Sequence, residues 1–299
     1  MAEVQRAIDI LGYSVNPAAR SLASGRTGSV AFVLSERQEH LFEDPNFGLF
    51  VRVFSRELRR RGRHLLVTAA EGKDEELFLG DYLTGGHVDG ALLTLPHARE
   101  PLLERLRASG LPVVVLGEPL GHQEALSWVA IDDEGAAEEI VRYLAAKGRS
   151  SIATITGPLN TSSGRRRYEG YRRVVGRRYR KDLVAHGDWS SHSGRAATEQ
   201  LLARGTTFDA LFCASDRMAV GAIAALREAG LGVPDDVAVA GFDDSVAATM
   251  VEPALTTVRI PFEESAMEAV RILEGLLDKT ITEPRRVLLP SKLVVRDSA

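Results

Sequence analysis

The stretch that decides the fold is residues 29–35, which read Ser-Val-Ala-Phe-Val-Leu-Ser. Its apolar side chains follow one another without a polar residue between them, which is typical of a strand buried on both faces of a parallel sheet. Similar runs recur downstream, at residues 64–70, 90–95, 112–117, 128–132, 151–157, 210–215 and 237–243. The sequence therefore predicts an α/β fold built on parallel sheets.

Amphipathic stretches of helical length lie between many of these runs, at residues 45–61, 134–147, 190–204 and 216–230. Strands that alternate with helices along a chain predict a parallel sheet covered by helices on both faces. About ten strands are more than one compact mononucleotide-binding unit holds. We therefore expect two doubly wound subdomains with a cleft between them.

Length and composition agree with a folded protein of two domains. The chain has 299 residues, which is about twice the usual size of one domain. Its 37 Lys and Arg residues against 41 Asp and Glu give a net charge of −4, and 44% of the residues are hydrophobic. This balance excludes a disordered chain and a protein that coats nucleic acid without specificity. A single cysteine, Cys213, excludes an internal disulfide and a cysteine-rich zinc site.

Signals for membrane insertion and for secretion are absent from the sequence. No apolar run approaches the ~20 residues that span a bilayer. The residues after Met1 lack the basic and apolar regions of a signal peptide. We expect a cytoplasmic protein that does not contact a membrane.

Enzyme signatures are also absent from the sequence. The chain has no Walker A sequence, no G-x-G-x-x-G after the first strand, no G-x-S-x-G and no H-E-x-x-H. Among its histidines only His186 and His192 lie close together, and their spacing suits no known zinc motif. We expect a non-enzymatic protein with no catalytic residues, no metal and no cofactor.

Two pairs of carboxylates and one tryptophan are candidates for a ligand pocket. Asp132-Asp133 and Asp243-Asp244 each end a predicted strand, which is where open α/β sheets bind ligands. The second residue of each pair could instead cap the helix that follows. Trp189 lies among small polar residues, a setting that suits stacking on a sugar or a base as well as packing between domains.

The first 27 residues break the strand–helix rhythm. Residues 3–11 are expected to form a short amphipathic helix that ends at Gly12, and residues 18–23 a second helical stretch. An extended segment before Pro17 separates the two, and residues 24–28 are typical of a linker. Helices this short cannot bury a core alone. The segment therefore belongs to a larger unit or docks on a partner.

Several sequence elements together resemble the LacI/GalR family of bacterial repressors. Residues 12–27 (GYSVNPAARSLASGRT) resemble the end of that family's DNA-binding headpiece and its hinge helix. Core motifs of the family are matched by RYEGY at 167–171, SDRMAVGA at 215–222, VPDDVAVAGFDD at 233–244, LTTV at 255–258 and LLPSKLVVR at 288–296. Each motif is weak alone, but together they follow the family's order along the whole chain.

The resemblance implies an architecture. A partial all-α headpiece and hinge helix would occupy residues 1–28, before a two-lobed core at residues 29–299 that resembles periplasmic binding proteins. The expected subdomains are an N-subdomain of about residues 29–131 and 259–284, and a C-subdomain of about residues 132–258 and 285–299.

The resemblance also assigns residues to two sites. The effector pocket would be lined by Asn46, Phe47, Asp132, Arg167, Trp189, Ser215 and Asp243. At the DNA site, Tyr13 and Asn16 would lie near the phosphates and Ala19 on the hinge helix. Leu22 of the same helix would wedge between base pairs in the minor groove.

The sequence departs from the family pattern in two places. Ser215 stands where the family usually has asparagine. The sequence also begins inside the last headpiece helix, so it does not contain the helix-turn-helix that reads bases in the major groove. We expect it to bind operator DNA specifically only when that module is restored.

The function implied by the resemblance is a transcriptional repressor that senses a small carbohydrate in its cleft. A carboxylate and a guanidinium suit adjacent sugar hydroxyls, and Trp189 suits the apolar face of a ring, although a purine would also stack there. The alternative is a cytoplasmic sugar- or nucleobase-binding protein that has lost DNA binding. The sequence leaves open which effector binds and whether it induces or co-represses.

The family further implies a homodimer, or a tetramer, that places two hinge helices side by side on DNA. The apolar faces of residues 45–61 and 77–83 are candidates for the dimer interface. Either face could instead belong to the core of one subunit.

Overall fold

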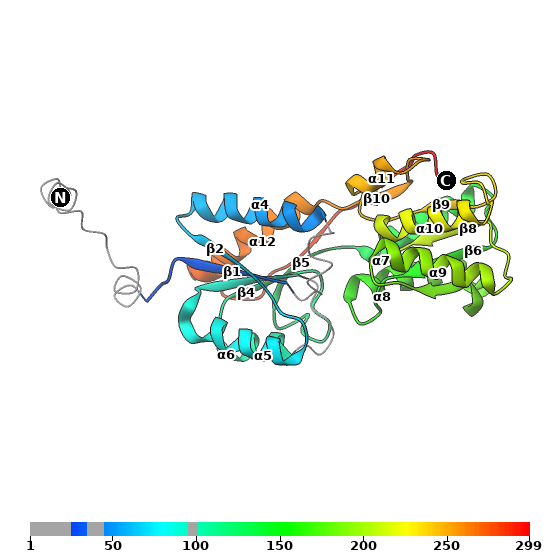
Figure 1. The fold of residues 1–299 in the computed structure, drawn as a ribbon. Coiled ribbons are helices and arrows are strands. Elements are labelled where there is room, and N and C mark those ends of the chain that lie inside the picture. Colours follow the sequence, from blue (N-terminus) through cyan, green and yellow to red (C-terminus); the bar gives the residue numbers. More distant parts are fainter. Residues whose placement is uncertain (1–24, 35–44, 95–100) are drawn as a thin grey trace, which may run out of the picture.

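The computed structural model describes residues 25–34, 45–94 and 101–299, which form two α/β lobes (Figure 1). Each lobe is a parallel sheet with helices on both faces, so the predicted fold class is confirmed. Residues 1–24, with the predicted headpiece remnant and hinge helix, lie outside the described residues. Within the described ranges, no helix combines the length and the apolar character needed to cross a membrane.

The N-lobe contains a sheet of six parallel strands in the order β11-β5-β4-β3-β1-β2. These are β1 (Ser29–Leu34), β2 (His64–Ala69), β3 (Gly90–Thr94), β4 (Val113–Leu116), β5 (Ser127–Ile131) and β11 (Arg286–Leu289). Helices α4 (Pro45–Arg60) and α12 (Phe262–Leu277) cover one face, while α5 (Lys73–Tyr82) and α6 (Pro101–Ser109) cover the other (Figure 1). Because β1 lies between β3 and β2 under both helix layers, its residues Val30 and Phe32 are fully buried.

The C-lobe contains a sheet of four parallel strands in the order β7-β6-β8-β9. These are β6 (Ile152–Thr156), β7 (Val184–His186), β8 (Ala210–Cys213) and β9 (Ala238–Ala240). Helices α7 (Asp133–Ala146) and α8 (Ser162–Val175) pack on one face, and α9 (Ser191–Ala203) and α10 (Asp216–Glu228) on the other. The short helix α11 (Val246–Met250) follows β9.

Three chain segments connect the lobes: one after β5, one after β10 (Thr257–Arg259) and one between β11 and β12 (Lys292–Val294). Strands β10 and β12 pair with each other in antiparallel register, with Val258 opposite Leu293. Both of these side chains pack into the C-lobe core. The two lobes are therefore joined by strands that are hydrogen-bonded to one another.

The structure corrects one predicted boundary. Residues 285–299 were expected in the C-subdomain, but β11 pairs in parallel with β5 of the N-lobe, with Arg286 opposite Trp128 and Leu289 opposite Ile131. The physical reason is an alternating pattern. Val287 and Leu289 pack against the N-lobe core, while Leu288 is 61% exposed at the edge of the sheet.

Candidate functional site

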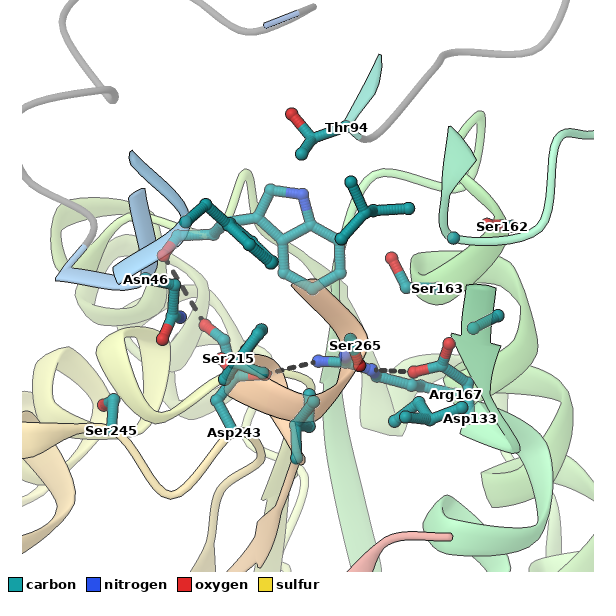
Figure 2. A pocket seen from close by; sticks show the side chains of 18 of the residues that line it. Asn46, Thr94, Asp133, Ser162, Ser163, Arg167, Ser215, Asp243, Ser245 and Ser265 are labelled. Atoms are coloured by element: carbon teal, nitrogen blue, oxygen red, sulfur yellow. Dashed lines mark hydrogen bonds and ion pairs between the residues drawn. The ribbon is translucent and has the colours of Figure 1, made fainter. Parts of the chain in front are cut away.

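A pocket lies between the lobes, where the carboxyl ends of strands from both sheets meet (Figure 2). Its apolar lining includes Phe47, Phe50, Val129, Ile131, Trp189, Ile260 and Phe262. Its polar lining includes Asn46, Thr94, Asp133, Ser162, Ser163, Arg167, Ser215, Arg217, Asp243, Ser245 and Ser265. Apolar walls with converging polar groups are typical of small-molecule sites.

Arg167 forms the centre of the polar side. It lies on α8, is 6% exposed, and donates from Nε to Asp133 at 2.7 Å and from Nη1 to Asp243 at 3.2 Å (Figure 2). It also donates to the carbonyl oxygen of Ala214 at 2.7 Å. Its guanidinium carbon lies 3.7 Å from the ring centroid of Phe242, a cation–π geometry. These contacts fix the plane and the direction of the guanidinium.

The charges around Arg167 keep it ionised in spite of its burial. Burial alone would lower the pKa of Arg167, but the carboxylates of Asp133 and Asp243 overcome that effect and raise it. Burial raises the pKa of Asp133, and the guanidinium of Arg167 opposes this only in part. The cluster therefore combines one buried cation with two carboxylates at the ends of two different strands.

The structure places Asp133, and not the predicted Asp132, in the pocket. Asp132 is exposed and caps α7, where its carboxylate accepts a hydrogen bond from the backbone of Gly135 at 2.9 Å. A helix cap at this pair was therefore predicted correctly, but at the wrong residue, because Asp132 and not Asp133 caps α7. Asp244 caps no helix either, since its buried carboxylate pairs with Arg259 and Arg296.

The turn at Asp243-Asp244 connects the pocket to the segments between the lobes. Both residues have positive φ angles, 113° and 54°. Residues other than glycine rarely adopt this region of backbone conformation. The turn directs Asp243 toward Arg167, while Asp244 pairs with Arg259 on β10 and with Arg296 after β12. Adjacent carboxylates thus contact the pocket and the connecting strands at once.

Trp189 lies against a glycine that leaves room for it. A Cβ on Gly157 would lie 2.1 Å from the indole ring, so only glycine fits beneath the ring. The backbone of Trp189 has a φ of 74°, and Ser190 directly after it caps α9 by accepting from Ser193 at 3.0 Å. Trp189 thus has a left-handed backbone conformation directly before the N-cap of α9, and its indole lines the pocket.

Six of the seven predicted pocket residues line the pocket: Asn46, Phe47, Arg167, Trp189, Ser215 and Asp243. Ser215 also caps α10, where its hydroxyl accepts from the backbone of Met218 at 3.2 Å. Sequence reasoning missed Thr94, the last residue of β3, and Ser245, the residue before α11, which both line the pocket. The rule that ligands lie at strand ends could have pointed to this region, because the predicted strand at residues 90–95 ends one residue after Thr94. The predicted DNA contacts Tyr13, Asn16, Ala19 and Leu22 lie outside the described residues.

Comparison with known proteins identifies the family. A model described as a periplasmic binding protein-like domain matches residues 141–299. The HTH-type transcriptional regulator CelR of Thermobifida fusca is 41% identical over 99% of this chain and 88% of its own length. The chain belongs to the LacI/GalR family of transcriptional regulators.

Solved structures of LacI/GalR members agree with the fold described above. A CelR–cellobiose complex matches with a TM-score of 0.88 and 39% identity, covering 99% of this chain and 89% of that one. The lac repressor dimer bound to operator and the anti-inducer ONPF matches with a TM-score of 0.86 and 25% identity, at the same coverage of both chains. The agreement extends over both lobes.

An ion pair joins the two lobes next to the pocket residues Gly117 and Arg167. Arg166 on α8 donates from Nε and Nη2 to the two carboxylate oxygens of Glu118, which follows β4 of the N-lobe, at 3.1 Å each. A third nitrogen donates to Glu134 of α7 at 3.3 Å. Arg166 therefore bonds to its own lobe and to the opposite lobe.

We expect Glu118→Gln to loosen the contact between the lobes. Both side chains are partly exposed, so the loss in unfolding free energy should be about 0.2–1 kcal/mol and should vanish at high salt. Small-angle scattering should show a larger radius of gyration at low salt. The matched control is Glu199→Gln, which removes the same charge from an ion pair with Arg195 within α9. Equal scattering from both variants would contradict a role for Glu118 between the lobes.

Proposed function

We propose that this chain is the core of an effector-responsive transcriptional repressor whose effector is a small carbohydrate bound between the lobes. The observation that carries the proposal is the Asp133–Arg167–Asp243 cluster beside Trp189 in the interlobe pocket. Carboxylates accept and a guanidinium donates hydrogen bonds to neighbouring sugar hydroxyls, and an indole covers the apolar face of a sugar ring.

Cellobiose is the first candidate effector. The CelR complex was solved with cellobiose, and the matched CelR chain is 39% identical over nearly the whole length of this one. A purine is the second candidate class, because a planar base would stack on Trp189. The hydroxyl-bearing lining from Ser162, Ser163, Ser215 and Ser265 favours a ligand with many hydroxyl groups over a flat base.

In this proposal residues that precede the described core contact operator DNA, and specific binding requires that a helix-turn-helix module is restored to the chain. Tyr13 and Asn16 would contact phosphates, while Ala19 and Leu22 would lie on the hinge helix. A regulator that reads operator DNA works where that DNA is, so we place it in the cytoplasm. Effector binding would act on the operator through the orientation of the two lobes.

Trp189 should report binding of the effector. Cellobiose covering the indole should change its fluorescence, and Trp189→Ala should weaken binding by ~1–3 kcal/mol in calorimetry. Trp128→Phe is the matched control, because the Trp128 side chain lies in the N-lobe core and donates to the carbonyl oxygen of Gln123 at 3.0 Å. That variant should keep both the fluorescence change and the affinity. Binding that is unaffected by Trp189→Ala would contradict the placement of the site.

We further propose that the core forms a homodimer through exposed apolar side chains on both lobes. On α5, Phe78 is 79% exposed and Tyr82 40%, and on α11, Met250 is 80% exposed and Val246 61%. The two side chains of each pair are four residues apart and share one face of their helix, and apolar patches on a protein surface mark interaction sites. The other candidate face, on α4, is part of the N-lobe core.

Phe78→Asp combined with Met250→Asp should therefore shift the chain from dimer toward monomer. Placing two carboxylates in each copy of an apolar interface costs several kcal/mol because the charges lose their hydration. Sedimentation at micromolar concentration measures the shift. Leu288→Asp is the control, since Leu288 is exposed on β11, at the sheet edge opposite β2. A wild-type protein that sediments as a monomer would overturn the proposal.

A further inference from the structure

A second pocket lies in the C-lobe, at the end of its sheet that is away from the interlobe pocket. Its lining includes Ile152 at the amino end of β6, Val175 at the end of α8 and Leu183 directly before β7. The interlobe pocket is lined instead by Ser163 in the first turn of α8. Ser163 and Val175 lie about 18 Å apart along the helix axis, because each residue of an α-helix adds about 1.5 Å. The two pockets are therefore separate sites.

Three arginines line this second pocket. Arg177 and Arg178 belong to a short 3₁₀ helix, Gly176–Arg178, that follows α8, and Arg180 comes two residues later. The pocket is lined entirely by described residues, and none of them is aspartate or glutamate. Guanidinium groups that share a pocket without a carboxylate repel one another. The lining therefore favours an anion among the arginines.

The carboxylates next to the pocket already have other partners. Asp182 accepts a hydrogen bond from Arg180 at 2.6 Å. Asp209 accepts from the backbone N–H groups of Ser150 at 2.8 Å and of Ser151 at 2.9 Å, two residues that line the pocket. Neither carboxylate contacts the other two arginines, so their charges are not neutralised from this side.

Arg177 and Arg178 make no hydrogen bond and no ion pair with any residue that the structure describes, and both are exposed. Arg173, near the end of α8, behaves differently, since it pairs with Glu134 and, at 3.0 Å, with Glu138. Arginines of this segment therefore pair with carboxylates where the fold supplies them. At the pocket the fold supplies none to Arg177 and Arg178.

The carboxyl end of α8 does not use these two arginines for hydrogen bonding. Cations are attracted to such an end by the helix dipole, and a side chain can donate to its last carbonyl groups. Within the described chain neither Arg177 nor Arg178 donates to a carbonyl oxygen of α8. The backbone N–H of Gly176 caps the helix instead and donates to the carbonyl oxygen of Arg172. Both guanidinium groups are thus available to a partner outside the chain.

We propose that this arginine pocket binds a small anion that carries a phosphate group. The planar guanidinium donates two parallel hydrogen bonds to phosphate oxygens, which makes arginine a preferred residue for this group. Beside the arginines lie the apolar side chains of Ile152, Val175 and Leu183, which suit the uncharged part of a phosphate ester. The inference goes beyond the proposed function, because no residue of the interlobe pocket takes part in it.

The test measures binding of two probes, inorganic phosphate and phenyl phosphate, by calorimetry at low salt, where such charges are least screened. Arg177→Gln combined with Arg178→Gln should weaken binding of both probes at least tenfold. The matched control combines Arg59→Gln with Arg285→Gln, which removes two exposed arginines of the N-lobe that also lack an ion pair among the described residues. The control should keep the affinity within twofold, and neither double variant should change the thermal midpoint of the free protein.

The two probes also distinguish the sources of the phosphate group. Tighter binding of phenyl phosphate assigns the pocket to a phosphate ester, since the ring would cover the apolar side chains. Equal binding assigns it to free phosphate. If the wild type binds neither probe with a dissociation constant below about 1 mM, the inference is overturned. It is also overturned if both double variants lose the same affinity, because the binding would then follow from overall charge alone.

Discussion

The buried guanidinium of Arg167 is the constraint around which this pocket is arranged. It bonds to Asp133 at the start of α7, to Asp243 after β9 and to the carbonyl oxygen of Ala214 after β8. Three strand ends of two sheets are thereby held at fixed distances from one cation. A buried charge is tolerated only when its partners are in place. The loops that line the pocket are therefore held in place by the guanidinium of Arg167.

The same cluster links the pocket to the parts of the protein that would transmit a signal. Asp243 and Asp244 are consecutive, yet one contacts Arg167 and the other contacts the connecting segments through Arg259 and Arg296. Helix α11, with its exposed Val246 and Met250, begins directly afterwards. A ligand that changes the position of Asp243 would act on the interlobe strands and on the proposed dimer face over a short path. Coupling of this kind requires a two-state element, which the relative orientation of the lobes would supply.

Much of the fold could be predicted from the sequence because buried parallel strands are continuous apolar runs. The prediction for residues 29–35 differs from β1 by one residue. Strand β11 was assigned to the wrong lobe because its alternating pattern is short and its partner is distant in sequence. Asp132 and Asp133 could not be separated, since either carboxylate suits a helix start and only the position of Arg167 decides between them. Thr94 and Ser245 became visible as pocket residues once the structure brought the end of β3 and the start of α11 to the same pocket.

The most direct measurement is the pH dependence of the thermal stability of Arg167→Met against wild type. Without the guanidinium, the partly buried Asp133 and Asp243 lose their cation and should bind protons more readily in the folded than in the unfolded protein. The stability of the variant should then rise as the pH falls. The loss of stability relative to wild type should be largest near about pH 7.5 and should shrink toward about pH 5. A deficit that is the same at every pH would contradict the central role given to this ion-pair cluster.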